Sequence, residues 1–192
     1  MRFEDFVPHL ARDRGLHARF ANTLSMLEYV GARKILKSQR AADVTLDTLA
    51  HAAEEIRHAA LLKRLALTLS DGALVTWEDD ALLCGPEGRA YFQGLDASCA
   101  AALGVPDPAA NYALTTLIVE ERATTLYPVW ADLLDRLEVN HRLRALIREE
   151  DGHLADIRDW LARSRPIDTA TLATLRRGEA AAFGALIAAM AA

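Results

Sequence analysis

Apolar residues recur every three or four positions along four segments of the chain, and no segment alternates apolar and polar residues as a half-buried strand does. The four segments are residues 16–39, 46–69, 109–127 and 140–163. The third segment ends either at Tyr127 or at a point beyond Pro128. Because an α-helix turns once in about 3.6 residues, this spacing predicts four amphipathic helices and an all-α fold.

The connections between these segments predict the order of the helices. Residues 43–48 supply turn and cap chemistry, so the first two helices are expected to form a hairpin over residues 16–70, and the last two a second hairpin over 109–163. Residues 71–108 separate the hairpins and include a short predicted helix over 87–103. Asp168 is a candidate N-cap for a helix within residues 164–192. We expect one domain over 1–192, a four-helix bundle with one long crossover and an additional C-terminal helix.

Composition supports a helical core and narrows the range of partners. Hydrophobic residues make up 52% of the chain and aromatic residues only 6%, so the core is expected to be mainly Ala, Leu, Ile and Val. A net charge of -5 gives no general attraction to phosphate backbones, and we expect no nucleic-acid partner. The longest weakly polar stretch, residues 180–192, is too short to span a bilayer. Cys84 and Cys99 lack the spacing of a disulfide framework or zinc site, which favours a cytoplasmic location without membrane contact.

Two of the predicted helices carry the same pattern, Glu-Glu-x-x-His, at residues 54–58 and 149–153. Residues three apart on a helix are neighbours, so Glu55 with His58, and Glu150 with His153, can each direct a carboxylate and an imidazole toward one point. The other helix of each hairpin also carries a glutamate, Glu28 in the first and Glu120 in the second. The chain therefore contains a weak internal repeat of a glutamate followed by Glu-x-x-His.

Helical wheels place these glutamates on the apolar faces of their helices. Glu28 shares its face with Leu24 and Ile35, and Glu120 shares its face with Leu117 and Tyr127. Both Glu-x-x-His motifs face inward by the same test. Glu121 lies about a quarter turn from Glu120, so it stays open as an alternative ligand or a supporting group.

Several carboxylates and imidazoles inside an apolar bundle predict metal coordination, because buried ions must be paired or bind a metal. Two divalent cations would neutralise four carboxylates, and one imidazole for each ion leaves coordination positions open. Mixed oxygen and nitrogen ligands with open positions suit iron or manganese better than a closed zinc site. The predicted metal ligands are Glu28, Glu55, His58, Glu120, Glu150 and His153.

This ligand pattern resembles the ferritin-like di-iron carboxylate superfamily over residues 16–163, and the string from Glu120 to Tyr127 resembles rubrerythrins. The resemblance implies a ferritin-like bundle and two iron ions that react with oxygen or peroxide and cycle between ferrous and ferric states. Ala123 stands in place of an additional rubrerythrin carboxylate, and neither cysteine belongs to a rubredoxin module, so an external electron donor is expected. Ile56 occupies the position of the haem-ligating methionine of bacterioferritins, and no haem is expected.

These observations predict a non-haem di-iron oxidoreductase that activates oxygen or peroxide on a small-molecule substrate. One alternative is a ferroxidase or an iron storage and detoxification protein that works as a homo-oligomer. Another is a metal-free structural bundle, which would leave six buried polar groups without an explanation.

The other polar residues near the motifs, and the other histidines, have simpler expected roles. His51 is expected to be a hydrogen-bonded core residue or a support for the ligands. Glu54 and Glu149 either orient imidazoles or form ion pairs with nearby arginines. Surface positions are expected for three histidines: His9, His17 and His141.

Overall fold

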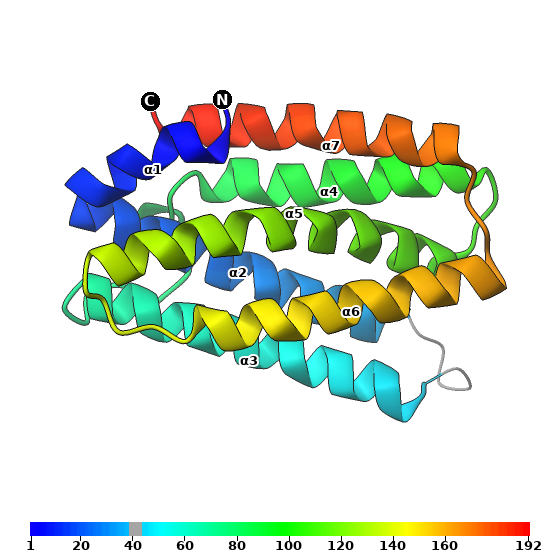
Figure 1. Cartoon of the computed structure of the whole chain (residues 1–192), viewed down its shortest axis with the longest axis horizontal. Helices are drawn as coiled ribbons and strands as arrows, with labels where there is room; N and C mark the ends of the chain where they lie inside the picture. The colour runs from blue at the N-terminus through cyan, green and yellow to red at the C-terminus, as the bar shows by residue number, and fades with distance from the viewer. Residues whose placement is uncertain (39–43) are drawn as a thin grey trace.

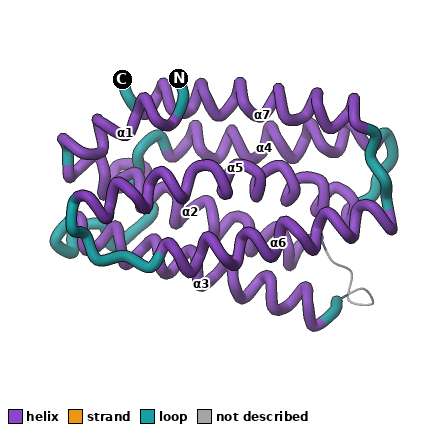
Figure 2. The backbone as a smooth tube through the Cα atoms, in the orientation of Figure 1, coloured by secondary structure: helices purple, strands orange, loops and turns teal. Residues whose placement is uncertain are grey.

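The computed structural model describes residues 1–38 and 44–192, and these residues form helices joined by short loops, without a strand (Figure 2). This confirms the all-α prediction. The predicted end of the first helix at Gln39 and the turn residue Asp43 lie outside the described residues. The helices are α1 (Phe3–Arg12), α2 (Arg14–Ser38), α3 (Leu46–Leu69), α4 (Gly85–Leu103), α5 (Pro108–Arg136), α6 (Leu143–Ser164) and α7 (Thr169–Met190), with a 3-10 turn η1 (Asp79–Ala81).

Two helical hairpins form the centre of the molecule. Helix α2 packs along α3, and α5 packs along α6, as the sequence pattern predicts (Figure 1). The long connection between the hairpins contains η1 and α4, and α4 lies beside α5 and α7. Asp168 caps α7 by accepting a hydrogen bond from the Thr171 amide at 2.9 Å. The crossover and C-terminal helix therefore cover the side of the bundle formed by α5 and α2.

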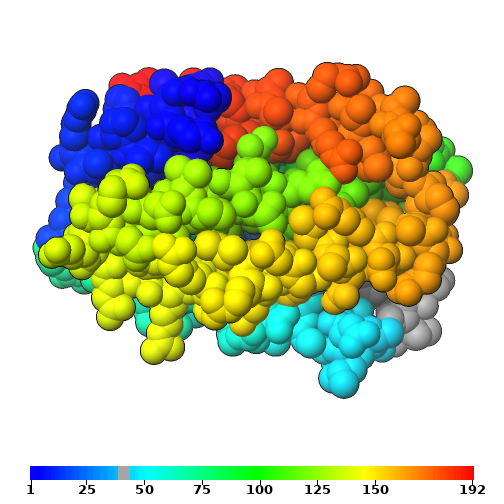
Figure 3. Space-filling view, viewed as in Figure 1, coloured from blue at the N-terminus to red at the C-terminus, as the bar shows by residue number. Residues whose placement is uncertain are grey.

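Helix α1 has no counterpart among the predicted helices. Its Phe3, Phe6 and Leu10 are spaced as one helical face and are buried against Phe20 of α2. The N-terminal amino group also donates a hydrogen bond to the Gly184 carbonyl at 3.1 Å, and α1 lies against the end of α7 (Figure 3). These contacts tie the start of the chain to its last helix.

Helix α5 continues through Pro128 to Arg136, so the later of its two predicted ends is the observed one. A proline inside a helix removes one backbone hydrogen bond, at a cost of about 3 kcal/mol. Buried Leu126, Trp130 and Leu134 on both sides of Pro128 hold the helix in the core. The continuous helix places Glu120 and Tyr127 on the same inner face.

Most buried apolar side chains belong to two clusters, one around Trp130 and one around Leu114. Along α3, α5 and α6, the buried glutamates and histidines fall between residues of these two clusters. The buried glutamates and histidines thus have an apolar cluster on each side along the bundle axis, one around Trp130 and one around Leu114. None of the described helices combines the length and the apolar character that are needed to cross a bilayer.

Candidate metal centre

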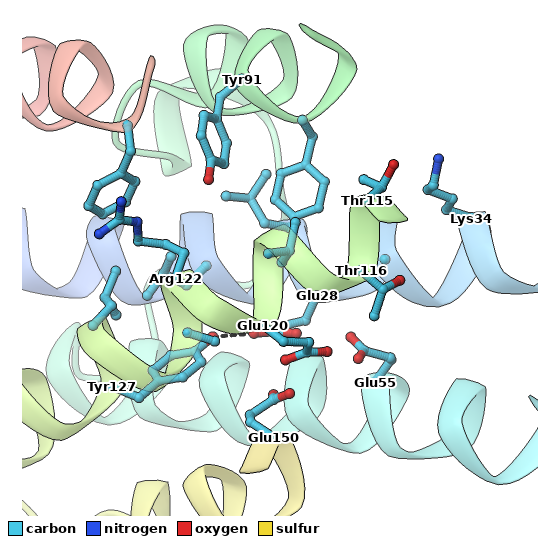
Figure 4. A pocket seen from close by; sticks show the side chains of 18 of the residues that line it. Glu28, Lys34, Glu55, Tyr91, Thr115, Thr116, Glu120, Arg122, Tyr127 and Glu150 are labelled. Carbon is cyan, nitrogen blue, oxygen red and sulfur yellow. Dashed lines mark hydrogen bonds between the residues drawn. The ribbon is translucent and has the colours of Figure 1, made fainter. Parts of the chain in front are cut away.

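The four helices of the two hairpins each direct one carboxylate into the middle of the bundle (Figure 4). Glu55, Glu120 and Glu150 are buried, and Glu28 is half-buried because it borders an internal cavity. His58 and His153 are buried beside them. The structure therefore brings all six residues of the predicted ligand set together.

The cluster divides into two groups that could each hold a metal ion. One group contains Glu28, His58 and Glu150, and the ligand atoms in it lie within 4.8 Å of one another. The same holds for the second group, which contains His51, Glu55, Glu120 and His153. Each group combines carboxylate oxygens with imidazole nitrogen, a donor set that suits a divalent metal ion.

Glu150 faces both groups. Its Oε1 atom lies 2.9 Å from Nδ1 of His58, and its Oε2 atom lies 3.4 Å from Nδ1 of His153. Glu55 and His58, in contrast, belong to different groups, although they come from the same motif. Each Glu-x-x-His motif therefore contributes one residue to each group. Glu150, which lies between the groups, could contact an ion in either one.

Three buried ligand atoms make no hydrogen bond of normal geometry among the described residues, although they lie close to one another: Nδ1 of His58, Nδ1 of His153 and Oε2 of Glu150. Buried polar atoms are normally hydrogen-bonded, and an exception calls for a water, an ion or a functional role. All three atoms lie at the centre of the cluster, where metal ions would contact them. The residues present therefore fit a metal pair.

The outer nitrogens of the two imidazoles are held by carboxylates from the opposite helix. Nε2 of His58 lies 2.7 Å from Oε2 of Glu149, and Nε2 of His153 lies 2.6 Å from Oε2 of Glu54. Arg57 lies 3.3 Å from Glu54 and 3.5 Å from Glu149, so these glutamates both orient imidazoles and form ion pairs. A carboxylate at Nε2 fixes the tautomer that presents Nδ1 to a metal.

His51 joins the cluster as a third imidazole. Its Nε2 atom lies 3.1 Å from Glu55 and 3.9 Å from Glu120, and its Nδ1 atom lies 2.6 Å from the Tyr112 hydroxyl. Burial, together with the nearby His153, lowers the pKa of His51 to about 4, which keeps the ring neutral as a metal ligand must be. The predicted ligand set did not include His51, although its position one turn before Glu55 was a visible signal.

Burial and mutual repulsion control the protonation of the carboxylates. Burial raises the pKa of Glu28 and Glu120 well above the usual range, and the charge on neighbouring carboxylates adds to the effect. Burial and the charge on Glu150 raise the pKa of Glu55 to about 7.

The pKa values of the two predicted histidine ligands are raised, whereas the pKa of His51 is lowered. Burial opposes the charged form of His58 and His153, but the nearby Glu150 carboxylate and the carboxylates at Nε2 prevail and raise the pKa of each to about 9. The cluster thus holds protons that bound metal ions would displace.

Glu121 points away from the cluster. It lies 3.1 Å from Arg158 of α6 and 2.6 Å from Arg176 of α7. Glu120 is the residue of this pair that reaches the other carboxylates.

The surface position expected for His17 is wrong. His17 is 1% exposed, and its Nε2 atom accepts a hydrogen bond from Nε1 of Trp130 at 2.7 Å. Burial lowers the pKa of His17 to about 4, so the ring is neutral and can act as the acceptor. His9 is exposed as expected, whereas His141 is half-buried and lies 2.9 Å from Asp135.

An apolar cavity of about 100 Å³ lies beside the carboxylates, among α2, α4, α5 and α7. Glu28, Glu55, Glu120 and Glu150 border it on one side (Figure 4). A small molecule in this cavity would lie directly against the candidate metal ligands.

Comparison with models of protein families, with curated proteins and with solved structures finds no match for this chain. The function is therefore inferred from the site itself.

Proposed function

We propose that the protein is a di-iron oxidoreductase that uses oxygen or peroxide to act on a small molecule held beside the metal pair. The observation that carries this proposal is the pair of ligand groups that meet at Glu150, with three buried ligand atoms that make no hydrogen bond of normal geometry among the described residues. The resemblance of the Glu and Glu-x-x-His spacing to ferritin-like di-iron carboxylate proteins supports it.

The two groups would each hold one ion. Glu28, His58 and Glu150 would bind the first, while Glu55, Glu120 and His153, with His51 as a further donor, would bind the second. Four carboxylates would balance two divalent ions, which removes the repulsion that raises the carboxylate pKa values. Bound iron would supply one-electron redox chemistry and the binding of oxygen or peroxide.

The protein's own residues would fix the ligands and control protons. Glu54 and Glu149 hold the imidazoles through Nε2. The Tyr127 hydroxyl donates a short hydrogen bond to Glu28, and burial raises the pKa of this phenol well above its usual range. Tyr127 therefore stays protonated and holds a proton at the Glu28 carboxylate. The apolar clusters at both ends exclude bulk water.

The cavity is the observation that favours an enzyme over an iron storage protein. A storage protein needs a path for iron, which polar and charged groups would line, whereas the wall here is mainly apolar. An apolar recess beside the ligands suits a small molecule.

The test is metal analysis of protein purified from iron-supplemented cells, alongside a Glu55→Ala, Glu150→Ala double variant and an Asp156→Ala control. Asp156 is an exposed carboxylate on α6. Wild type and the control should each hold about two iron ions per chain, and the double variant should lose them.

Substoichiometric metal in the wild type after anaerobic ferrous reconstitution would refute the di-iron proposal. Native mass spectrometry separates the two iron functions. A large hollow assembly with many irons per chain would indicate storage, and a small assembly with about two irons per chain would support an enzyme.

A further inference from the structure

Small side chains create the cavity beside the carboxylates. Gly31 of α2 and Ala123 of α5 both line it and are half-buried, although both lie on inner helix faces. Thr116 and Val119 of α5 also line the cavity and are half-buried. A closed bundle would fill this space with larger side chains, so these positions leave room for a bound group.

The cavity reaches the metal ligands. A Cβ atom built at Gly31 would lie 3.2 Å from Oε2 of Glu55, so the α2 backbone comes close to that carboxylate. Ala123 is one turn from both Glu120 and Tyr127 on α5, and all three residues line the cavity. A molecule between Gly31 and Ala123 would therefore be next to the atoms that carry the chemistry.

The charged side chains in the cavity wall, other than the candidate metal ligands, are already paired. Lys34 forms a short ion pair with Asp96 of α4. Arg122 of α5 pairs with Glu179 of α7 through two contacts of 2.8 and 2.7 Å, and the Tyr91 hydroxyl donates to the same carboxylate at 2.8 Å. Apart from the candidate metal ligands, an ionic ligand would thus find no unpaired counter-charge in the described part of this wall.

Most of the remaining wall is aromatic and aliphatic, and the hydroxyl side chains Thr115 and Thr116 also line it. Aromatic rings come from α2, α4 and α7, and Leu and Val side chains complete the surface; they include Phe20, Phe92, Phe183, Leu24, Leu27 and Val119. Such a wall favours apolar groups, because their transfer out of water is favourable and charged groups would lose hydration without compensation.

We propose that this cavity binds an uncharged hydrocarbon group, about the size of one aromatic ring or a short alkyl chain, as the part of the substrate that is oxidised. An apolar protein cavity of roughly 150 Å³ holds benzene; the cavity here, at about 100 Å³, is smaller, so one ring or a short chain is the largest group expected to fit. The assignment of this group as a substrate rests on the proposed di-iron function. Binding of the group depends only on the cavity.

Toluene, benzoate and benzylamine test this proposal, because they have similar shapes and differ in charge. Their affinities are measured by calorimetry with metal-free and metal-loaded protein. Toluene should bind at least tenfold more tightly than benzoate to the metal-free protein, and at least tenfold more tightly than benzylamine to the metal-loaded protein, in which bound metal neutralises the carboxylates. Ala123→Leu, which fills the cavity, should weaken toluene binding at least tenfold. Ala97→Leu is the matched control, because Ala97 is exposed on α4 and outside the cavity, and it should leave the affinity unchanged.

Intermolecular nuclear Overhauser effects in the wild type keep the test independent of how well Ala123→Leu folds. Toluene should show contacts with the methyl groups of Ala123 and Val119. Contacts elsewhere, equal affinity for benzoate, or full binding by well-folded Ala123→Leu would overturn the inference.

Metal analysis of the same samples separates the two proposals. A protein that holds two metal ions and does not bind toluene refutes the cavity proposal alone. A protein that binds toluene in the cavity and takes up no metal refutes the di-iron function and leaves the cavity as a binding site.

Discussion

Replacing Glu149 by glutamine should weaken metal binding, although Glu149 is not itself in either ligand group. The carboxylate lies 2.7 Å from Nε2 of His58, and the substitution keeps the size of the side chain while removing its charge. Loss of such a partner typically lowers metal affinity by about 10- to 100-fold, which equals about 1.4 to 2.8 kcal/mol. Because the side chain is 37% exposed and shares Arg57 with Glu54, we expect a value near tenfold.

The corresponding change in the other motif, Glu54→Gln, should have the larger effect. Glu54 is 29% exposed and lies 2.6 Å from Nε2 of His153. Anaerobic competition titrations of Mn²⁺ and Fe²⁺ against a chelator would measure both affinities. Asp156→Asn, in an exposed carboxylate on α6, is the control for the loss of one negative charge. If Glu149→Gln and Glu54→Gln changed affinity no more than this control, the imidazoles would not be oriented by these carboxylates.

Three further predictions concern the stability of the metal-free protein. Its melting temperature should fall as the pH rises from about 4.5 to about 7, because Glu55, whose pKa burial raises to about 7, keeps its proton in the folded protein over a range in which the unfolded chain releases it. This contribution is about 3 kcal/mol, and Glu55→Gln should weaken the dependence; an unchanged slope would contradict the assignment. His17→Leu should cost about 1 to 3 kcal/mol in urea unfolding, because it leaves the buried Trp130 indole N–H without its acceptor, whereas exposed His9→Leu should cost little. Arg122→Leu should cost about 3 kcal/mol by leaving the buried Glu179 carboxylate without its cationic partner, and adding Glu179→Leu should recover part of the loss; full additivity would show that the two residues do not interact.

The inward-facing ligands could be predicted from the sequence because their positions depend on local helix geometry. Glu28 and Glu120 lie on apolar faces, and Glu150 is three residues from His153, so the spacing alone determines which face each side chain occupies. The hairpins followed from loop length, since short connections make neighbouring helices antiparallel. The sequence pattern therefore predicts the order and approximate ends of α2, α3, α5 and α6.

Side-chain contacts between helices far apart in the sequence could not be predicted from residue spacing. The sequence does not show that Glu149 reaches His58 or that Glu54 reaches His153, because these contacts depend on how α3 and α6 are rotated about their axes. The same reason explains His17, whose partner Trp130 is 113 residues away. A histidine can be buried at low cost only where the fold provides a hydrogen-bond partner, as Trp130 does for His17.

Proton sharing explains how the bundle tolerates this cluster before it binds metal. Burial keeps Glu28 and Glu120 protonated. Burial also opposes ionisation of Glu150, but the neighbouring Glu120, His153 and His58 together lower its pKa and keep it ionised. The positive and negative charges of the folded cluster therefore roughly balance without any cation. Metal ions would displace those protons and bind the same ligand atoms. The helices can therefore assemble first and bind metal afterwards. The fold would then preorganise the site instead of depending on the metal to form it.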